Sequence, residues 1–218
     1  MKFLSLSLCA AFCCTAASAQ QQPQATPAQD ATKKANARPA AEPAEPAEPF
    51  DKATVAEMAG RCVTLETEAG AVEVEMLAEA APETVRNFLN LSATGAYDTT
   101  VFERVVKGFV IQGGDLWTRE KLTPELSRRA RRTIPDEPNP VRHVRGVVSM
   151  ARTSEPNSAT TNFFILAGDG SHLDGTFAAF GRVRSGMEVV DQINQAPVEG
   201  EKPLKPVRLT RASVKPCA

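Results

Sequence analysis

The chain has 218 residues and is almost neutral, with 25 lysines and arginines against 26 aspartates and glutamates. This balance lacks the basic excess typical of proteins that bind nucleic acids or anionic membrane surfaces, so we expect neither partner. The length permits one domain with a complete hydrophobic core.

Residues 1–19 have the features of an export signal. Lys2 provides a positive start, residues 3–15 are mostly apolar, and Ala17-Ser18-Ala19 matches a small-residue cleavage site. The apolar stretch is too short to span a bilayer as a helix of the mature protein. We therefore predict an exported protein without stable membrane insertion, periplasmic if the source is a Gram-negative bacterium.

The five cysteines divide between this segment and the rest of the chain. Cys9, Cys13 and Cys14 lie in the signal, which leaves lipidation as an alternative, but none of them follows the small residue that lipoprotein signals require. Cys62 and Cys217 remain in the mature chain. Two cysteines in an exported protein predict one disulfide, with free or intermolecular thiols as the alternative.

Residues 20–54 are predicted to form a disordered linker. They are rich in Ala, Pro, Glu and Gln, and the triplet Ala-Glu-Pro occurs at residues 41–43, 44–46 and 47–49. Such a composition cannot build a core and favours an extended spacer, with a docking motif as the alternative. The folded domain is then expected to cover residues 55–218.

The domain begins with a predicted β-hairpin and a helix. Residues 62–67 and 71–76 alternate between apolar and polar, and residues 68–70 supply the turn. Pro82 suits the first turn of a helix that ends before Gly95. The residues expected to face the core are Val72, Val74 and Met76 in the second strand and Val85, Phe88 and Leu89 in the helix.

Residues 101–115 contain two apolar runs around a Lys-Gly link, which predicts a second hairpin. In the first run, strict alternation places Arg104 on the same face as Phe102 and Val106. Burying an unpaired guanidinium is costly, so this arginine needs a partner or a functional task. The alternatives are that it reaches solvent along the strand or pairs with Glu103 or Asp115.

Residues 116–145 form a long irregular segment with four prolines. Its run of arginines at positions 128, 129, 131 and 132 is expected to be a solvated face, because the chain has no basic excess. The alternative is an anion-binding patch on a structural domain that recognises an acidic partner. Trp117, the only tryptophan, is expected to anchor part of this segment.

The remaining elements are short. Residues 146–152, 162–166, 177–183 and 207–214 are predicted strands. Ser185-Gly186-Met187-Glu188 resembles a capping box that opens a helix, with Met187, Val190 and Ile193 inward. Many short strands with hairpin links and two helices favour a closed antiparallel sheet, with the helices packed outside it.

Three sequence blocks identify a family resemblance. Residues 102–115 contain Phe-Glu-Arg, Gly-Phe and Gln-Gly-Gly, and residues 146–165 contain Ser-Met-Ala-Arg and Asn-Phe-Phe-Ile. His-Leu-Asp-Gly follows at residues 172–175 and Phe-Gly-Arg-Val at 180–183. In order and separation these blocks resemble the signature of the cyclophilins, of the bacterial and exported kind, over residues 61–215.

The resemblance implies a closed eight-stranded antiparallel β-barrel with two capping α-helices. It also implies peptidyl-prolyl cis/trans isomerase activity on proline-containing polypeptides, without a cofactor, in a protein that we expect to be a monomer. By the same resemblance, Arg104 corresponds to the catalytic arginine. The residues that correspond to the substrate-binding positions are Phe109, Val110, Gln112, Ala151, Arg152, Asn162, Phe164, His172, Leu173 and Phe177.

Three of these positions depart from the family pattern. Asn162 stands where glutamine is usual, His172 where a tryptophan is common, and Phe177 where many eukaryotic members have histidine. These departures keep open a second hypothesis, a cyclophilin-like chaperone or binding module with weak turnover. If the first and last strands of the barrel are antiparallel neighbours, Cys62 and Cys217 come together as the predicted disulfide.

Two other site types find little support in the sequence. No His, Cys and carboxylate cluster has metal-ligand spacing, so we expect no metal site. Ser149, His172 and Asp174 could suggest a hydrolase triad, but no Gly-x-Ser-x-Gly motif accompanies them.

Overall fold

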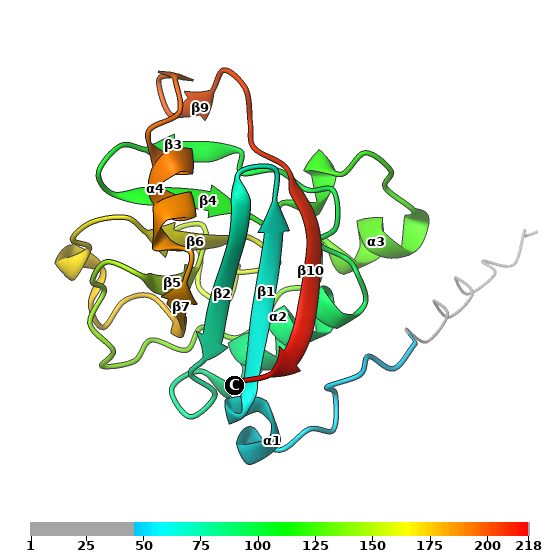
Figure 1. Cartoon of the computed structure of the whole chain (residues 1–218). Helices are drawn as coiled ribbons and strands as arrows, with labels where there is room; N and C mark the ends of the chain where they lie inside the picture. The colour runs from blue at the N-terminus through cyan, green and yellow to red at the C-terminus, as the bar shows by residue number, and fades with distance from the viewer. Residues whose placement is uncertain (1–45, 218) are drawn as a thin grey trace, which may run out of the picture. The chain divides into compact units, whose positions relative to one another are not determined.

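The computed structural model describes residues 46–217 (Figure 1). The predicted signal segment and residues 20–45 of the predicted linker lie outside the described residues. Within the described part of the chain, no helix is long and apolar enough to cross a membrane.

The main sheet has eight strands, and all its ladders are antiparallel. Its order is β10-β1-β2-β7-β5-β6-β4-β3, so the first and last strands pair at one edge, where Figure 1 shows β10, β1 and β2 side by side. The strands are β1 (Arg61–Thr67), β2 (Gly70–Met76), β3 (Arg104–Val106), β4 (Val110–Gly113), β5 (Val147–Met150), β6 (Phe163–Leu166), β7 (Ala179–Ser185) and β10 (Leu209–Pro216). A separate two-stranded ribbon pairs β8 (Val198–Glu199) with β9 (Lys202–Pro203).

The prediction of a closed barrel is wrong: the sheet is an open half-barrel. Its edge strands β3 and β10 are not paired with each other. The segments next to them meet through the isolated bridge of Val101 with Arg208 and a few backbone hydrogen bonds, such as that from the Phe102 N–H to the Val207 carbonyl oxygen at 2.9 Å. β3 has only three residues, and Thr99 before it takes a positive φ of 65° that interrupts extended backbone. On the other side Pro206 has no N–H to donate. The contacts between these edges therefore do not extend into a continuous ladder.

Two longer helices pack on the sheet as expected, α2 (Pro82–Ala93) and α4 (Met187–Asn194). In α2 the predicted residues Val85, Phe88 and Leu89 are all fully buried. Phe88 lies at the centre of an aromatic group, with ring centroids 5.3 Å from Phe163 and 4.9 Å from Phe180. The described residues also contain the short α1 (Val55–Ala59) and α3 (Pro124–Arg129) and two 3₁₀ turns, η1 (Leu116–Thr118) and η2 (Ser171–Leu173), which the sequence did not predict.

The predicted capping box of α4 is wrong. Ser185 still belongs to β7 and pairs with Glu73, and the residue that precedes the helix is Gly186, which makes no side-chain cap bond. Gly186 has a φ of 91°, and a Cβ there would clash with the carbonyl oxygen of Ala71. Glycine is needed because the chain turns sharply against β2 at this point.

The sheet buries apolar residues on both of its faces. The larger cluster contains Val72, Val74 and Met76 of β2, as the alternation predicted, together with Phe163. The smaller cluster contains Phe164, the next residue along β6, with Val110 of β4. Adjacent phenylalanines thus serve opposite faces, because successive side chains of a strand alternate. The smaller cluster supports the candidate site described below.

The folded unit begins before Val55, the boundary expected from the sequence. Residues 46–54 pack against α2: the Phe50 N–H donates to Asn90 Oδ1 at 2.7 Å, and Arg86 Nη1 donates to the carbonyl oxygens of Phe50 and Ala53. Glu48 accepts hydrogen bonds from Arg129 Nε at 2.8 Å and Arg132 Nη1 at 3.3 Å. The last Ala-Glu-Pro triplet is therefore part of the domain.

These contacts also correct two expectations for residues 116–145. Arg129 is buried against Glu48 and Asn87 and so does not belong to a solvated face, although its neighbours Arg128, Arg131 and Arg132 are exposed. Trp117 is 51% exposed and stacks beneath the guanidinium of Arg131 at 4.9 Å. It does not anchor the segment by burial; the short helix α3 and the pairing of Arg129 order it.

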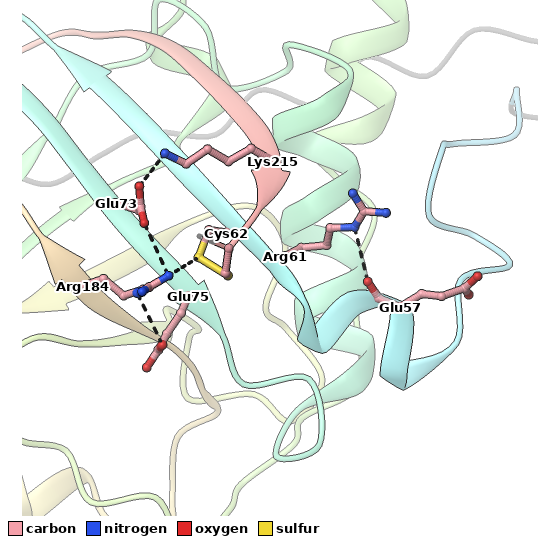
Figure 2. The surroundings of a disulfide bond; sticks show 8 residues. Glu57, Arg61, Cys62, Glu73, Glu75, Arg184 and Lys215 are labelled. Atoms are coloured by element: carbon pink, nitrogen blue, oxygen red, sulfur yellow. Dashed lines mark hydrogen bonds and ion pairs between the residues drawn. A yellow bond between two sulfur atoms is a disulfide. The ribbon is translucent and has the colours of Figure 1, made fainter.

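A disulfide joins the first strand of the main sheet to the residue after its last strand (Figure 2). Cys62 lies near the start of β1 and Cys217 directly follows β10, with their Cα atoms 5.0 Å apart. The antiparallel register of β1 and β10 pairs Cys62 with Lys215, which brings the two sulfur atoms together. Around the bond, Lys215 pairs with Glu73 at 2.5 Å, and Arg184 Nη1 donates to the Cys62 sulfur at 3.7 Å.

Candidate active site

Arg104 lies on β3, directly opposite Gln112 of β4 in the antiparallel register. Its Nη1 donates a hydrogen bond to Gln112 Oε1 at 3.3 Å, and its Nε donates to Glu201 Oε2 at 2.6 Å. The partner of the guanidinium is therefore Glu201, from the turn between β8 and β9, and neither Glu103 nor Asp115. The hydrogen bond from Arg104 holds the pKa of the Glu201 carboxyl below its usual range.

A cavity of about 240 Å³ lies beside this arginine. Phe164 and Phe177 meet edge to face, with ring centroids 6.0 Å apart, and the Arg152 guanidinium lies 5.0 Å from the Phe177 ring. The cavity thus combines an apolar interior with cationic groups at its margin, a common design for small-molecule and peptide side-chain pockets. Its lining residues are Arg104, Phe109, Gln112, Ala151, Arg152, Phe164, Leu173 and Phe177.

Three of the residues predicted from the sequence do not line this cavity. Val110 is buried behind it, in the cluster that contains Phe164. Asn162 lines a neighbouring cavity of about 280 Å³, which shares Gln112 with the first. His172 is exposed and packs against the Phe109 ring, with centroids 5.1 Å apart. The fold therefore brings the predicted residues to one region, but in three different environments.

Two carboxylates in this region received no site role from the sequence: Glu103, considered there only as a partner of Arg104, and Glu201. Glu103 Oε1 accepts hydrogen bonds from Gln112 Nε2 and Asn162 Nδ2, both at 3.3 Å. Burial raises the pKa of Glu103 to about 7, and the nearby charge of Asp115 adds to the rise. The available signal was the position of Glu103 within the apolar run of residues 101–106, directly before β3. Glu201 gave no signal, because it lies 97 residues from Arg104 in the chain.

An Asp-His-Ser network lies near the cavity, with His143 in the place that the sequence suggested for His172. His143 Nδ1 is 3.2 Å from Asp174 Oδ1, and its Nε2 is 3.1 Å from Ser149 Oγ. The Ser149 hydroxyl can also donate to the Ala178 carbonyl at 2.9 Å. His143 and Ser149 are completely buried, so no ester or peptide can reach the hydroxyl. The network is structural, and His172 takes no part in it.

We expect His143→Ala to lower the free energy of unfolding by about 2–4 kcal/mol, since it leaves a cavity and removes a partner from buried Ser149. Burial holds the pKa of His143 below the usual 6.5, although Asp174 opposes this shift. The neutral imidazole is therefore the stable form in the folded protein. Its stabilising contribution is complete above pH 6.5 and declines as the pH falls below that value.

Chemical denaturation at pH 7 and pH 5 checks both expectations. The difference between the wild type and His143→Ala should be smaller at pH 5. His172→Ala, which alters the other, exposed histidine, is the matched control and should change stability by less than about 0.5 kcal/mol. Equal stability of His143→Ala and the wild type at pH 7 would contradict the structural role.

No group of three His, Cys, Asp or Glu side chains in the described part of the chain could hold a metal ion. The chemistry available to the cavity itself is that of a guanidinium beside an apolar space.

Comparison with known proteins identifies the family. Residues 62–214 match the family model described as cyclophilin type peptidyl-prolyl cis-trans isomerase/CLD. Peptidyl-prolyl cis-trans isomerase A of Dickeya dadantii is 38% identical over 165 residues, which cover 70% of this chain and 83% of that protein. The isomerase cypE of Dictyostelium discoideum is 34% identical over 165 residues, which cover 72% and 99%.

A solved structure has the same fold. The crystal structure of a cyclophilin type peptidyl-prolyl cis-trans isomerase of Cryptosporidium parvum, in the presence of the dipeptide Ala-Pro, is similar with a TM-score of 0.62 and 30% identity. The similarity covers 71% of this chain and 98% of that chain. This chain therefore belongs to the cyclophilin-type peptidyl-prolyl cis-trans isomerases.

Proposed function

We propose that this isomerase acts on Xaa-Pro bonds of exported polypeptides in the cavity beside Arg104, and that Arg104 is its catalytic residue. The observation that carries the proposal is the guanidinium next to an apolar cavity lined by Phe109, Phe164 and Leu173. A prolyl ring held there places its amide within reach of the arginine. The Ala-Pro dipeptide named with the Cryptosporidium parvum relative supports a proline-containing ligand.

The reaction changes no covalent bond, so the site must lower the barrier to rotation about the amide. That barrier is about 18–20 kcal/mol and arises from resonance. In the twisted transition state the proline nitrogen loses conjugation and gains a lone pair. A donor aimed at that nitrogen binds the transition state more strongly than either planar isomer, which is the condition for catalysis.

Arginine suits this task because it remains protonated and carries several donors in a rigid fork. In this site Glu201 holds Nε and Gln112 contacts Nη1, which limits the rotation of the side chain and orients the rest of the fork. The apolar walls add a second effect. A planar amide is more polar than a twisted one, so exclusion of water raises the ground state more than the transition state.

A chaperone or binding module with weak turnover is the second candidate, favoured by Asn162 and His172. The two functions differ in a protease-free isomerisation assay on residues 20–218. An isomerase accelerates a Pro-containing peptide at sub-stoichiometric protein concentration, and a binding module does so only in proportion to the bound fraction. Protection of an unfolded protein from aggregation without acceleration of the peptide would favour the second candidate.

Export rests on the segment at residues 1–19 and is supported by the disulfide, since such bonds persist in oxidising compartments. Expression of the full chain in a Gram-negative host, followed by fractionation and N-terminal sequencing, tests it. We expect a periplasmic protein that begins at Gln20. A cytoplasmic protein that retains Lys2 would overturn the proposal of export.

A further inference from the structure

Glu103 is a carboxylate beside the candidate active site that is largely buried, so contact with solvent does not explain why a charged residue stands there. Its Oε1 accepts two hydrogen bonds, while its Oε2 is buried and has no hydrogen-bond partner. Leaving a carboxylate oxygen buried and unpartnered is costly. Such a cost directly before β3, beside Arg104, suggests that the charge serves the site at the expense of stability.

The two donors to Glu103 come from neighbouring segments of the sheet, since β4 pairs with β6. Gln112 belongs to β4 and lines both cavities, and Asn162 precedes β6 and lines the second one. Gln112 lies between an acceptor-only group and a donor-only group: its Nε2 faces Glu103 and its Oε1 faces Arg104. This arrangement permits one orientation of the amide.

We propose that Glu103 is a positioning residue for the isomerisation, whose carboxylate holds Gln112 and Asn162 so that the Gln112 carbonyl oxygen orients Arg104. This inference rests on the proposed role of Arg104. A hydrogen bond to an ionised acceptor is roughly twice as strong as one between neutral groups. The ionised form of Glu103 therefore holds the amides more firmly than the protonated form does.

The proposed role of Glu103 makes turnover depend on pH. The pKa of Glu103 is raised to about 7, so its ionisation falls within the range of an ordinary assay. Among the described residues, Asp115 is the charged side chain that acts on it, while Gln112 and Asn162 are neutral. Turnover should increase as the pH rises through about 7 and become constant above it.

The same ionisation has the opposite effect on stability. A carboxyl whose pKa is higher in the folded than in the unfolded protein stabilises the fold at low pH, and this contribution is lost as the pH rises through about 7. Removal of the charge should therefore preserve or increase stability at pH 8. A merely structural Glu103 predicts a loss of stability instead.

The test compares kcat and KM of the wild type, Glu103→Gln and Asp115→Asn between pH 5.5 and 8.5, with thermal unfolding of each protein. We expect Glu103→Gln to lower kcat at pH 8 about three- to tenfold with little change in KM, to lose the inflection near pH 7, and to unfold at or above the wild-type temperature. Asp115→Asn removes the neighbouring charge and keeps both amide contacts, so its inflection should move to lower pH.

His172→Gln is a further control, because it removes the exposed imidazole beside Phe109, and its profile should keep the inflection. A wild-type profile without an inflection, or an inflection that persists in Glu103→Gln, would overturn the inference. If Glu103→Gln does not fold, the pH profiles of the wild type and Asp115→Asn still test the inference, because the inflection near pH 7 must move to lower pH in Asp115→Asn. A wild type without turnover would instead overturn the proposed function, and turnover that is sensitive to Arg104→Ala but not to Glu103→Gln would overturn this inference alone.

Discussion

Arg104→Ala should lower kcat/KM at least about tenfold while the domain remains folded. A charge-assisted hydrogen bond contributes about 1.5–3 kcal/mol, which corresponds to about 10- to 150-fold in rate if it is made only in the transition state. The side chain is 39% exposed and its ion pair with Glu201 is also exposed, so its removal should have little effect on stability. The measurement is peptide isomerisation, with thermal unfolding of the same preparation.

Two variants make this experiment specific. Arg104→Lys retains the charge but loses the fork and should give an intermediate rate, because a lysine cannot hold Gln112 and Glu201 while it also donates to the substrate. Arg211→Ala removes an exposed arginine on β10, at the opposite end of the strand order, and should isomerise at the wild-type rate. An Arg104→Ala protein with wild-type kcat/KM would show that the arginine is not the catalytic group.

Loss of the Cys62–Cys217 disulfide should lower the free energy of unfolding by about 5 kcal/mol. The bond joins residues 155 apart in sequence, and in the chain-entropy model so long a loop greatly restricts the unfolded state. For a domain of this size, such a loss corresponds to a decrease in Tm of about 10–20 °C. Thermal unfolding with and without reductant, together with thiol titration, measures it.

Cys217→Ser is the matched control, because it leaves the fully buried Cys62 in place and changes only the residue beyond β10. It should unfold at the temperature of the reduced wild type and show no response to reductant. Activity at low temperature should be unchanged, since neither cysteine lines the cavity beside Arg104. A reduced wild type with the original Tm would show that the bond adds no stability.

The sequence alone predicted the elements with strong local patterns. The alternation of Val72, Val74 and Met76 predicted their burial in β2, and Pro82 with the following apolar stripe predicted α2. The three motif blocks also predicted the family and the region to which the cavity residues belong. These features depend on residues close together in the chain, or on spacing that the family retains, so they can be recognised without coordinates.

The tertiary structure decided what depends on contacts between distant segments. The sheet is open because the short β3 and the irregular segments beside it cannot pair continuously with β10. Glu48 belongs to the domain because Arg129, 81 residues away, donates a hydrogen bond to its carboxylate in a largely buried ion pair. Arg104 obtains its orientation from Glu201 and Gln112, and Gln112 from Glu103. The sequence marked Arg104 as a charge in need of partners, and Gln112 lies on the other strand of the predicted hairpin. Glu201 comes from a turn 97 residues away that only the folded protein brings near, because contacts between distant segments are set by packing and not by local periodicity.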